Sequence, residues 1–102
     1  MVTVIFRAKM QAGKEDQAIA AMEKMARAVE GQEESTLLYL VCRSQDDPSE
    51  LIVLESYKDD AAFKAHAATP HMGDMRGAFA ELFDVSAVKL ERLERLAGFA
   101  RG

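Results

Sequence analysis

The sequence predicts one α+β domain built on an antiparallel sheet, and three observations lead to this fold class. The chain has 102 residues, a length typical of one domain, so residues 1–102 are expected to form a single unit. About half of the residues, 49%, are apolar, which is typical of a globular core. Short β-branched segments alternate with helical-period segments in the order β-α-β-β-α-β, with the second helical region interrupted. This is the order of the ferredoxin-like fold, in which helices cover one face of the sheet.

The chain opens with a strand at residues 2–10, where "VTVIFRAKM" is rich in β-branched and aromatic residues. Alternation along this strand produces two opposite faces, formed by Val2, Val4, Phe6 and Ala8 and by Thr3, Ile5, Arg7 and Lys9. A turn at Gly13 leads to a helix over residues 14–30. Its apolar residues recur at spacings of three and four: Ala18, Met22, Met25, Ala26 and Val29. Gly31 is expected to end this helix.

Two further strands, at residues 36–43 and 51–58, flank the polar turn "SQDDPSE" and predict a hairpin. Both strands are apolar at successive positions, as in "LLYLVC" and "LIVL", and not only at alternate ones. The helices of this chain can cover only one face of such a sheet. A second copy of the chain is the simplest cover for the other face, so the sequence predicts a homodimer with two sheets packed face to face.

The second helical region divides at Thr69-Pro70. A short helix, capped by the aspartate at 59 or 60, carries Phe63 and His66. It ends before Pro70 because a residue that precedes proline is disfavoured in the helical conformation. Thr69 can then cap a second helix, one face of which carries Met72, Met75, Phe79 and Leu82. A last strand is expected at residues 84–93.

Composition and charge exclude several classes of partner. The net charge is −4 and basic residues are interleaved with acidic ones, as in "LERLER", so a nucleic-acid partner is not expected. No apolar run approaches the length of a membrane span, so no membrane association is expected. The single cysteine, Cys42, cannot form an internal disulfide, which fits a reducing, cytoplasmic location. Cys42 itself is predicted to be a small core residue.

The two histidines of the chain, His66 and His71, stand on either side of the helix break. Five residues of unbroken helix turn by about 140°, so the two side chains would not share a face. A zinc-binding helix places two histidines four residues apart and adds an acidic or cysteine ligand, and no such set is visible in the sequence. There is also no glycine-rich phosphate loop and no nicotinamide fingerprint. The sequence therefore predicts no metal and no other cofactor.

Each histidine has two interpretations. His66 follows Phe63 by three residues on an inward side, so it is either a packed core histidine or a partly desolvated neutral base. His71 follows Pro70 at a helix start, where the dipole disfavours added positive charge. It is either a solvent-facing residue or a neutral hydrogen-bond acceptor. The nearby methionines either fill the core or line a pocket for a flat aromatic guest: Met22, Met25, Met72 and Met75.

Glu55 and Tyr57 share one face of the third strand with apolar residues. A carboxylate in such a strand needs a partner or a pocket. Arg7 of the first strand is a candidate partner, and the pair is either a structural ion pair near the sheet edge or a contact to substrate. Tyr39 lies on the opposite face of its strand from Cys42 and is a further candidate contact.

The stretch "LESYKDDAAFKAHAATPHM", residues 54–72, resembles the signature of the antibiotic biosynthesis monooxygenase family. That signature runs from a strand through "E-x-aromatic" and a short helix to "A-H-x-x-T-P-H", here Glu55, Tyr57, Ala65, His66, Thr69, Pro70 and His71. The first strand and turn, "VTVIFRAKMQAGKEDQ", are also similar to those of the family. The resemblance implies a ferredoxin-like homodimer whose two sheets join into an α/β barrel.

The resemblance further implies a monooxygenase that acts on a small electron-rich aromatic or quinol with dioxygen and uses neither metal nor flavin. A substrate that ionises to a stabilised anion can itself pass an electron to oxygen, so the protein needs an apolar pocket, a base and a donor for the anion. By this resemblance His66 is the base and faces the pocket, with His71 as a second catalytic candidate. The candidate substrate-binding residues are Tyr57, Phe63, Glu55, Arg7 and Tyr39.

The same resemblance leaves two alternatives open. Relatives that isomerise a phosphorylated signal sugar are similar in "Y-K-D" and "T-P-H", which implies a cofactor-free isomerase as the second candidate function. A non-catalytic dimeric module that binds a small ligand is the third, because fold does not fix function. The chain contains no Trp and no Asn, on which the haem-degrading and polyketide-oxidising branches rely, so those activities are not expected.

Overall fold

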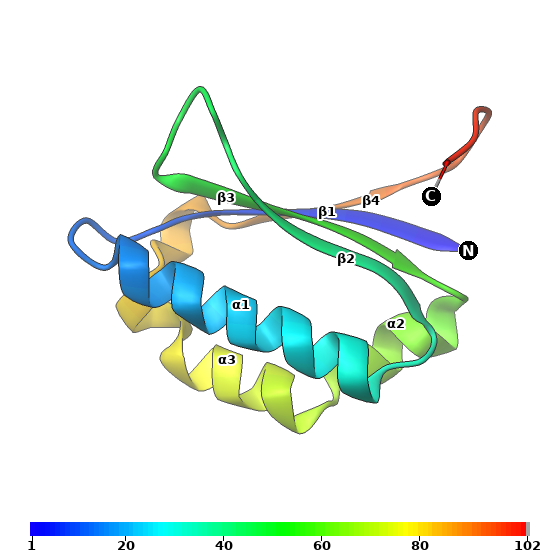
Figure 1. The fold of residues 1–102 in the computed structure, drawn as a ribbon, viewed down its shortest axis with the longest axis horizontal. Helices are drawn as coiled ribbons and strands as arrows, with labels where there is room; N and C mark the ends of the chain where they lie inside the picture. The colour runs from blue at the N-terminus through cyan, green and yellow to red at the C-terminus, as the bar shows by residue number, and fades with distance from the viewer. Residues whose placement is uncertain (102) are drawn as a thin grey trace.

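The structure, a computed structural model, describes residues 1–101 and consists of an antiparallel sheet with helices on one face (Figure 1). In chain order the elements are β1 (Val2–Lys9), α1 (Glu15–Gln32), β2 (Thr36–Arg43), β3 (Glu50–Tyr57), α2 (Asp60–Ala67), α3 (Pro70–Leu82), the short 3-10 helix η1 (Val85–Ala87) and β4 (Lys89–Leu93). The strand order in the sheet is β2-β3-β1-β4. The predicted ferredoxin-like α+β fold is confirmed.

The helix caps follow the sequence signals. The side chain of Asp59 accepts a hydrogen bond from the backbone N–H of Ala62 at 2.8 Å, which begins α2. Thr69 Oγ1 accepts from the N–H of Met72 at 3.3 Å, and Pro70 occupies the first turn of α3. The same Thr69 hydroxyl donates to the carbonyl of His66 at 2.8 Å. One threonine therefore joins the end of α2 to the start of α3.

Two element boundaries differ from the prediction by more than one residue. Helix α1 continues to Gln32, because Gly31 is helical and does not end it. The last strand begins only at Lys89, since Asp84 accepts a hydrogen bond from the backbone of Ser86 at 3.0 Å and caps η1. The predicted strand over residues 84–93 is thus correct for its second half alone.

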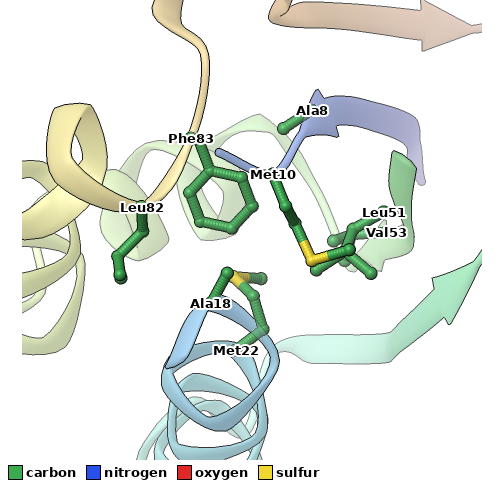
Figure 2. Packing of buried hydrophobic residues seen from close by; sticks show 8 residues of the cluster. All are labelled: Ala8, Met10, Ala18, Met22, Leu51, Val53, Leu82 and Phe83. Atoms are coloured by element: carbon green, nitrogen blue, oxygen red, sulfur yellow. The ribbon is translucent and has the colours of Figure 1, made fainter. Parts of the chain in front are cut away.

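One end of the layer between sheet and helices is a densely packed apolar cluster (Figure 2). Its buried members are Ala8, Met10, Ala18, Met22, Leu51, Val53, Leu82 and Phe83. Phe83 is 1% exposed and stacks on Phe79 with 4.7 Å between ring centroids. Its backbone also bridges to Met10, which ties the end of α3 to the end of β1. This "packed cluster" anchors α1 against the sheet.

The other face of the sheet carries no helix (Figure 1). Leu40 and Leu54 are paired there, with Cys42 opposite Ile52. Leu40 is 49% exposed and Cys42 is exposed as well. The prediction of Cys42 as a core residue is therefore wrong for the single chain, because its position in β2 directs it to this "helix-free face". None of the helices described for residues 1–101 is long and apolar enough to span a bilayer.

Candidate functional site

Glu33 and the two histidines form one buried cluster. The Nδ1 atom of His66 lies 2.8 Å and 3.0 Å from the two carboxylate oxygens of Glu33. The Nε2 atom of His71 lies 2.5 Å from Oε2 of the same carboxylate. The three side chains are only 6%, 8% and 11% exposed for His66, Glu33 and His71. We refer to these residues as the Glu33–histidine cluster.

Three separate elements build the Glu33–histidine cluster. Glu33 follows the end of α1, His66 lies in α2 and His71 lies in the first turn of α3. The break at Thr69-Pro70 redirects the chain between the two histidines, so both reach the same carboxylate although an unbroken helix would separate them. The expectation that no acidic ligand accompanies the histidines is therefore wrong. The interpretation of His71 as a solvent-facing residue is wrong for the same reason.

The charge of Glu33 determines where the imidazole protons lie. Burial alone would raise the pKa of this carboxyl, but hydrogen bonds from His71, Thr36 and His66 outweigh it and hold the pKa below its ordinary value. Thr36 Oγ1 donates to Oε1 of Glu33 at 2.7 Å. An ionised carboxylate only accepts hydrogen bonds, so His66 donates from Nδ1–H and His71 donates from Nε2–H. In the neutral form of each ring, the lone pair then lies on Nε2 of His66 and on Nδ1 of His71.

His66 also lines a cavity of about 370 Å³ between the sheet and helices α1, α2 and α3. Most of the wall is apolar and includes Phe6, Met22, Met25, Phe63, Met72 and Phe79. The sequence left open whether the four methionines fill the core or line a pocket. All four line this cavity, and Met22 also belongs to the packed cluster. Polar groups in the wall come from Tyr39, Glu55, His66 and Arg76. The result is an apolar chamber with few polar groups, as ligand sites commonly are.

Two tyrosines flank the His66 ring. The ring of Tyr39 is 5.7 Å away and that of Tyr57 is 5.4 Å away, measured between centroids. Burial raises the pKa of Tyr39, so its hydroxyl stays protonated and can donate a hydrogen bond. Tyr57 is fully buried, does not line the cavity, and packs edge-to-face on Phe63 at 5.2 Å. Tyr39 and Phe63 thus lie in the cavity wall, whereas Tyr57 supports it from behind.

Glu55 is the second buried carboxyl near the cavity. It is 6% exposed and accepts a hydrogen bond from the hydroxyl of Tyr57. Burial raises the pKa of Glu55 although the Tyr57 hydroxyl and His66 act in the opposite direction. Glu55 lies in β3 opposite Val4 of β1, on the helix-covered face. Glu55 therefore offers the cavity a carboxyl that gives up its proton less readily than an exposed one.

Arg7 does not join the site. It lies opposite Ile52 on the helix-free face and forms an ion pair with Glu50 at 3.7 Å. The predicted Arg7–Glu55 pair is wrong, because the two side chains have opposite parity in adjacent strands. Sequence reasoning also missed Glu33. It is 33 residues from His66, so no local spacing connects the two, and the only signal was its place at the end of α1.

Fold and site together define a ferredoxin-like α+β protein that holds a carboxylate-anchored histidine in the wall of an apolar cavity. A family model described as antibiotic biosynthesis monooxygenase matches residues 1–78. The chain therefore belongs to the antibiotic biosynthesis monooxygenase family.

Solved structures with the same fold include several proteins of low sequence identity. One is the protein PA3566 of Pseudomonas aeruginosa, which is 27% identical with a TM-score of 0.80 and 94% of each chain covered. Another is Rv0793 of Mycobacterium tuberculosis, with 24% identity, a TM-score of 0.86, and 97% of this chain and 98% of that chain covered. An antibiotic biosynthesis monooxygenase shows 20% identity and a TM-score of 0.86, covering 95% of this chain and 100% of its own. Among curated proteins, no match was found.

Proposed function

We propose that this protein is a cofactor-independent monooxygenase that oxygenates a small electron-rich aromatic, of the quinol type, with dioxygen. The observation that carries the proposal is the orientation of His66. Its Nδ1 is anchored on Glu33, and the ring stands in the wall of the 370 Å³ cavity with Nε2 free of any hydrogen bond to residues 1–101. A base held in this way can take a proton from a guest in the cavity.

The proposed first step is proton transfer from a quinol hydroxyl to Nε2 of His66. The imidazolium that forms keeps its Nδ1–H hydrogen bond to Glu33, whose negative charge stabilises it. The Tyr39 hydroxyl can donate to the resulting quinolate oxygen, since Tyr39 lines the same cavity. General base catalysis of this kind typically contributes about 10²- to 10⁴-fold in rate.

The anion then supplies the electrons. One oxygen atom of O₂ forms a bond to a ring carbon and the other leaves as water, while the quinol is oxidised to a hydroxyquinone. The quinol provides all the electrons of this change, so no other reductant enters the balance. The apolar wall favours the reaction in two ways. It excludes water from the anion, and it accommodates both the non-polar dioxygen and the aromatic ring.

The lining of the cavity also separates this proposal from the sugar isomerase. A phosphorylated sugar would require several cationic groups, and the described cavity wall contains one basic side chain, Arg76, which is exposed and donates to the carbonyl of Ala67 at 2.9 Å. A non-catalytic module that binds a small ligand would have a similar cavity, so the oxygen-uptake assay described next separates that alternative from the monooxygenase. The apolar cavity with one histidine therefore supports the quinol over the sugar.

The test compares His66 with His71 in an oxygen-uptake assay with a panel of quinols. We expect His66→Ala to lower the rate about 100-fold while the fold is kept, and His71→Ala to cost clearly less. His66→Asn is the matched control, because its amide can still donate to Glu33 but cannot act as the base. It should be as inactive as His66→Ala. Equal rates for the two alanine variants, or full activity of His66→Ala, would show that His66 is a packed structural histidine.

We also propose that the active form is a homodimer joined through the helix-free face. The support is the row of apolar side chains left uncovered there, including Leu38, Leu40 and Leu54. Light scattering should show two chains per particle at micromolar concentration. Leu40→Asp should shift the particle to a monomer, because two copies each place a charge in the interface. Ala80→Asp, at an exposed position of α3, is the control and should stay dimeric. A wild-type monomer would contradict the proposal.

A further inference from the structure

The Glu33–histidine cluster has a second chemical capacity besides anchoring a base. It brings two imidazoles and one carboxylate together, the ligand types that zinc and its neighbours in the first transition row prefer. One donor atom from each of the three residues lies within 4.8 Å of the others. We infer that this cluster binds a divalent cation of the zinc class, and that the bound cation and the free base at His66 exclude one another.

The two spacings between Glu33 and the imidazoles need little adjustment for such an ion. In a tetrahedral zinc site with bonds near 2.0 Å, ligand atoms are about 3.3 Å apart. Here the Glu33 oxygens lie 2.8 Å from His66 Nδ1 and 2.5 Å from His71 Nε2, so these pairs would open by less than about 1 Å. Because the ligands belong to the end of α1, to α2 and to α3, the fold itself holds them in place.

The surroundings provide both support and access. Thr36 donates to Glu33 Oε1 at 2.7 Å and would hold the ligating carboxylate in position. Glu33, His66 and Thr69 also line an open hollow of about 430 Å³ at the surface, between the α1–β2 turn and α2. A cation can enter from this side, and water can occupy its remaining coordination position.

The exclusion follows from the positions of the imidazole protons. A metal needs the lone pairs of His66 Nδ1 and His71 Nε2, the two atoms that now carry protons toward Glu33. Each neutral ring must therefore move its proton to the opposite nitrogen. On His71 that nitrogen is Nδ1, a buried atom with no partner among residues 1–101. On His66 it is Nε2, the atom proposed to take the quinol proton. A metal-bound His66 consequently cannot act as the base.

The binding experiment is a calorimetric titration of chelator-treated protein with zinc sulfate, repeated with cobalt, whose visible absorption becomes intense when the ion enters a tetrahedral site. We expect one zinc per chain. Glu33→Gln and His71→Ala should each weaken binding at least tenfold, with folding checked by circular dichroism. Cys42→Ser is the matched control, because Cys42 is the one free thiol and is exposed, and this variant should bind as the wild type does. No saturable binding, binding unchanged in His71→Ala, or loss in Cys42→Ser would each overturn the inference.

The exclusion is tested separately, and this half rests on the proposed function. Zinc should inhibit oxygen uptake over the same concentration range in which it binds, and a chelator should restore the rate. Unchanged or increased oxygen uptake at saturating zinc would overturn the exclusion. If the protein oxygenates no quinol, the calorimetric result still decides whether the cation binds, so failure of the proposed activity and failure of the metal site are distinguishable.

Discussion

The two ends of the helix-covered face of the sheet differ in how the space between the strands and the helices is filled. Where α1 begins, Phe83, Met10 and Met22 fill the space between helix and strand (Figure 2). Where α1 ends, the buried groups are Glu33, His66 and the Glu55–Tyr57 pair, and an open cavity remains beside them. The packed end contributes stability through apolar contacts. At the second end, which we call the hollow end because of this cavity, several polar groups are buried where apolar side chains would pack more stably. This arrangement points to a functional role.

The largest effect should come from the packed end. Phe83→Ala removes a ring that is 1% exposed, and we expect it to lower the free energy of unfolding by about 3–5 kcal/mol. Urea denaturation measures this change. Phe99→Ala is the control, because Phe99 is 80% exposed, and its effect should stay within about 0.5 kcal/mol. If both variants lost a comparable free energy of unfolding, the packed end would not contribute more to stability than the exposed part of the chain.

The next effect should come from the hollow end and concern the rate more than the fold. Glu33→Gln replaces a pure acceptor by a group that is also a donor, so one imidazole must turn its lone pair toward it. We expect oxygen uptake to fall about 100-fold, equivalent to about 2.7 kcal/mol. Glu34→Gln changes the exposed neighbouring carboxylate and should leave the rate unchanged. If the two variants behaved alike, Glu33 would not be the group that orients His66.

The smallest effect concerns the pH dependence of stability. The pKa of Glu55 is raised in the folded protein, so the folded state holds this proton more tightly than the unfolded chain does. Wild-type stability contributed by Glu55 is therefore present below the ordinary pKa of a glutamate and is lost as the pH rises through the folded value. Glu55→Gln lacks this loss and can still accept from Tyr57. We expect the variant to gain stability relative to the wild type between pH 4 and pH 7.

Chemical denaturation of both proteins at the two pH values measures that gain. Other carboxyls with lowered pKa, such as Glu33 and Asp47, give the opposite trend but are common to both proteins and cancel in the difference. A difference that is the same at pH 4 and pH 7 would show that Glu55 does not carry the proton more tightly in the folded state.

Local signals predicted most of the fold. The hairpin turn, the Thr69-Pro70 break and the cap at Asp59 all depend on neighbouring residues, and the structure confirms each of them. The late start of β4 was missed because Asp84 caps η1 through a side-chain hydrogen bond that competes with strand pairing. The resemblance of residues 54–72 also predicted the family correctly. The family model that matches residues 1–78 confirms it.

The site was less predictable because it depends on contacts between distant segments. Glu33 meets His66 and His71 only after α1 is packed beside α3. The faces of Arg7 and Glu55 depend on the register between β1 and β3, which parity within each strand does not fix. Cys42 looked like a core residue because composition alone does not say which face of a strand the helices cover.

The hydrogen bond between Glu33 and His66 joins the end of α1 to α2, two segments 33 residues apart in the chain. It can therefore report local opening between these two helices. The Nδ1 proton of His66 lies between a buried ring and a buried carboxylate. It can exchange with solvent only after its hydrogen bond to Glu33 breaks, and that bond breaks whenever α2 separates from the end of α1. Its exchange rate, followed by nuclear magnetic resonance beside the amide protons of the central strand β1, would therefore tell how often the hollow end opens while the sheet stays folded.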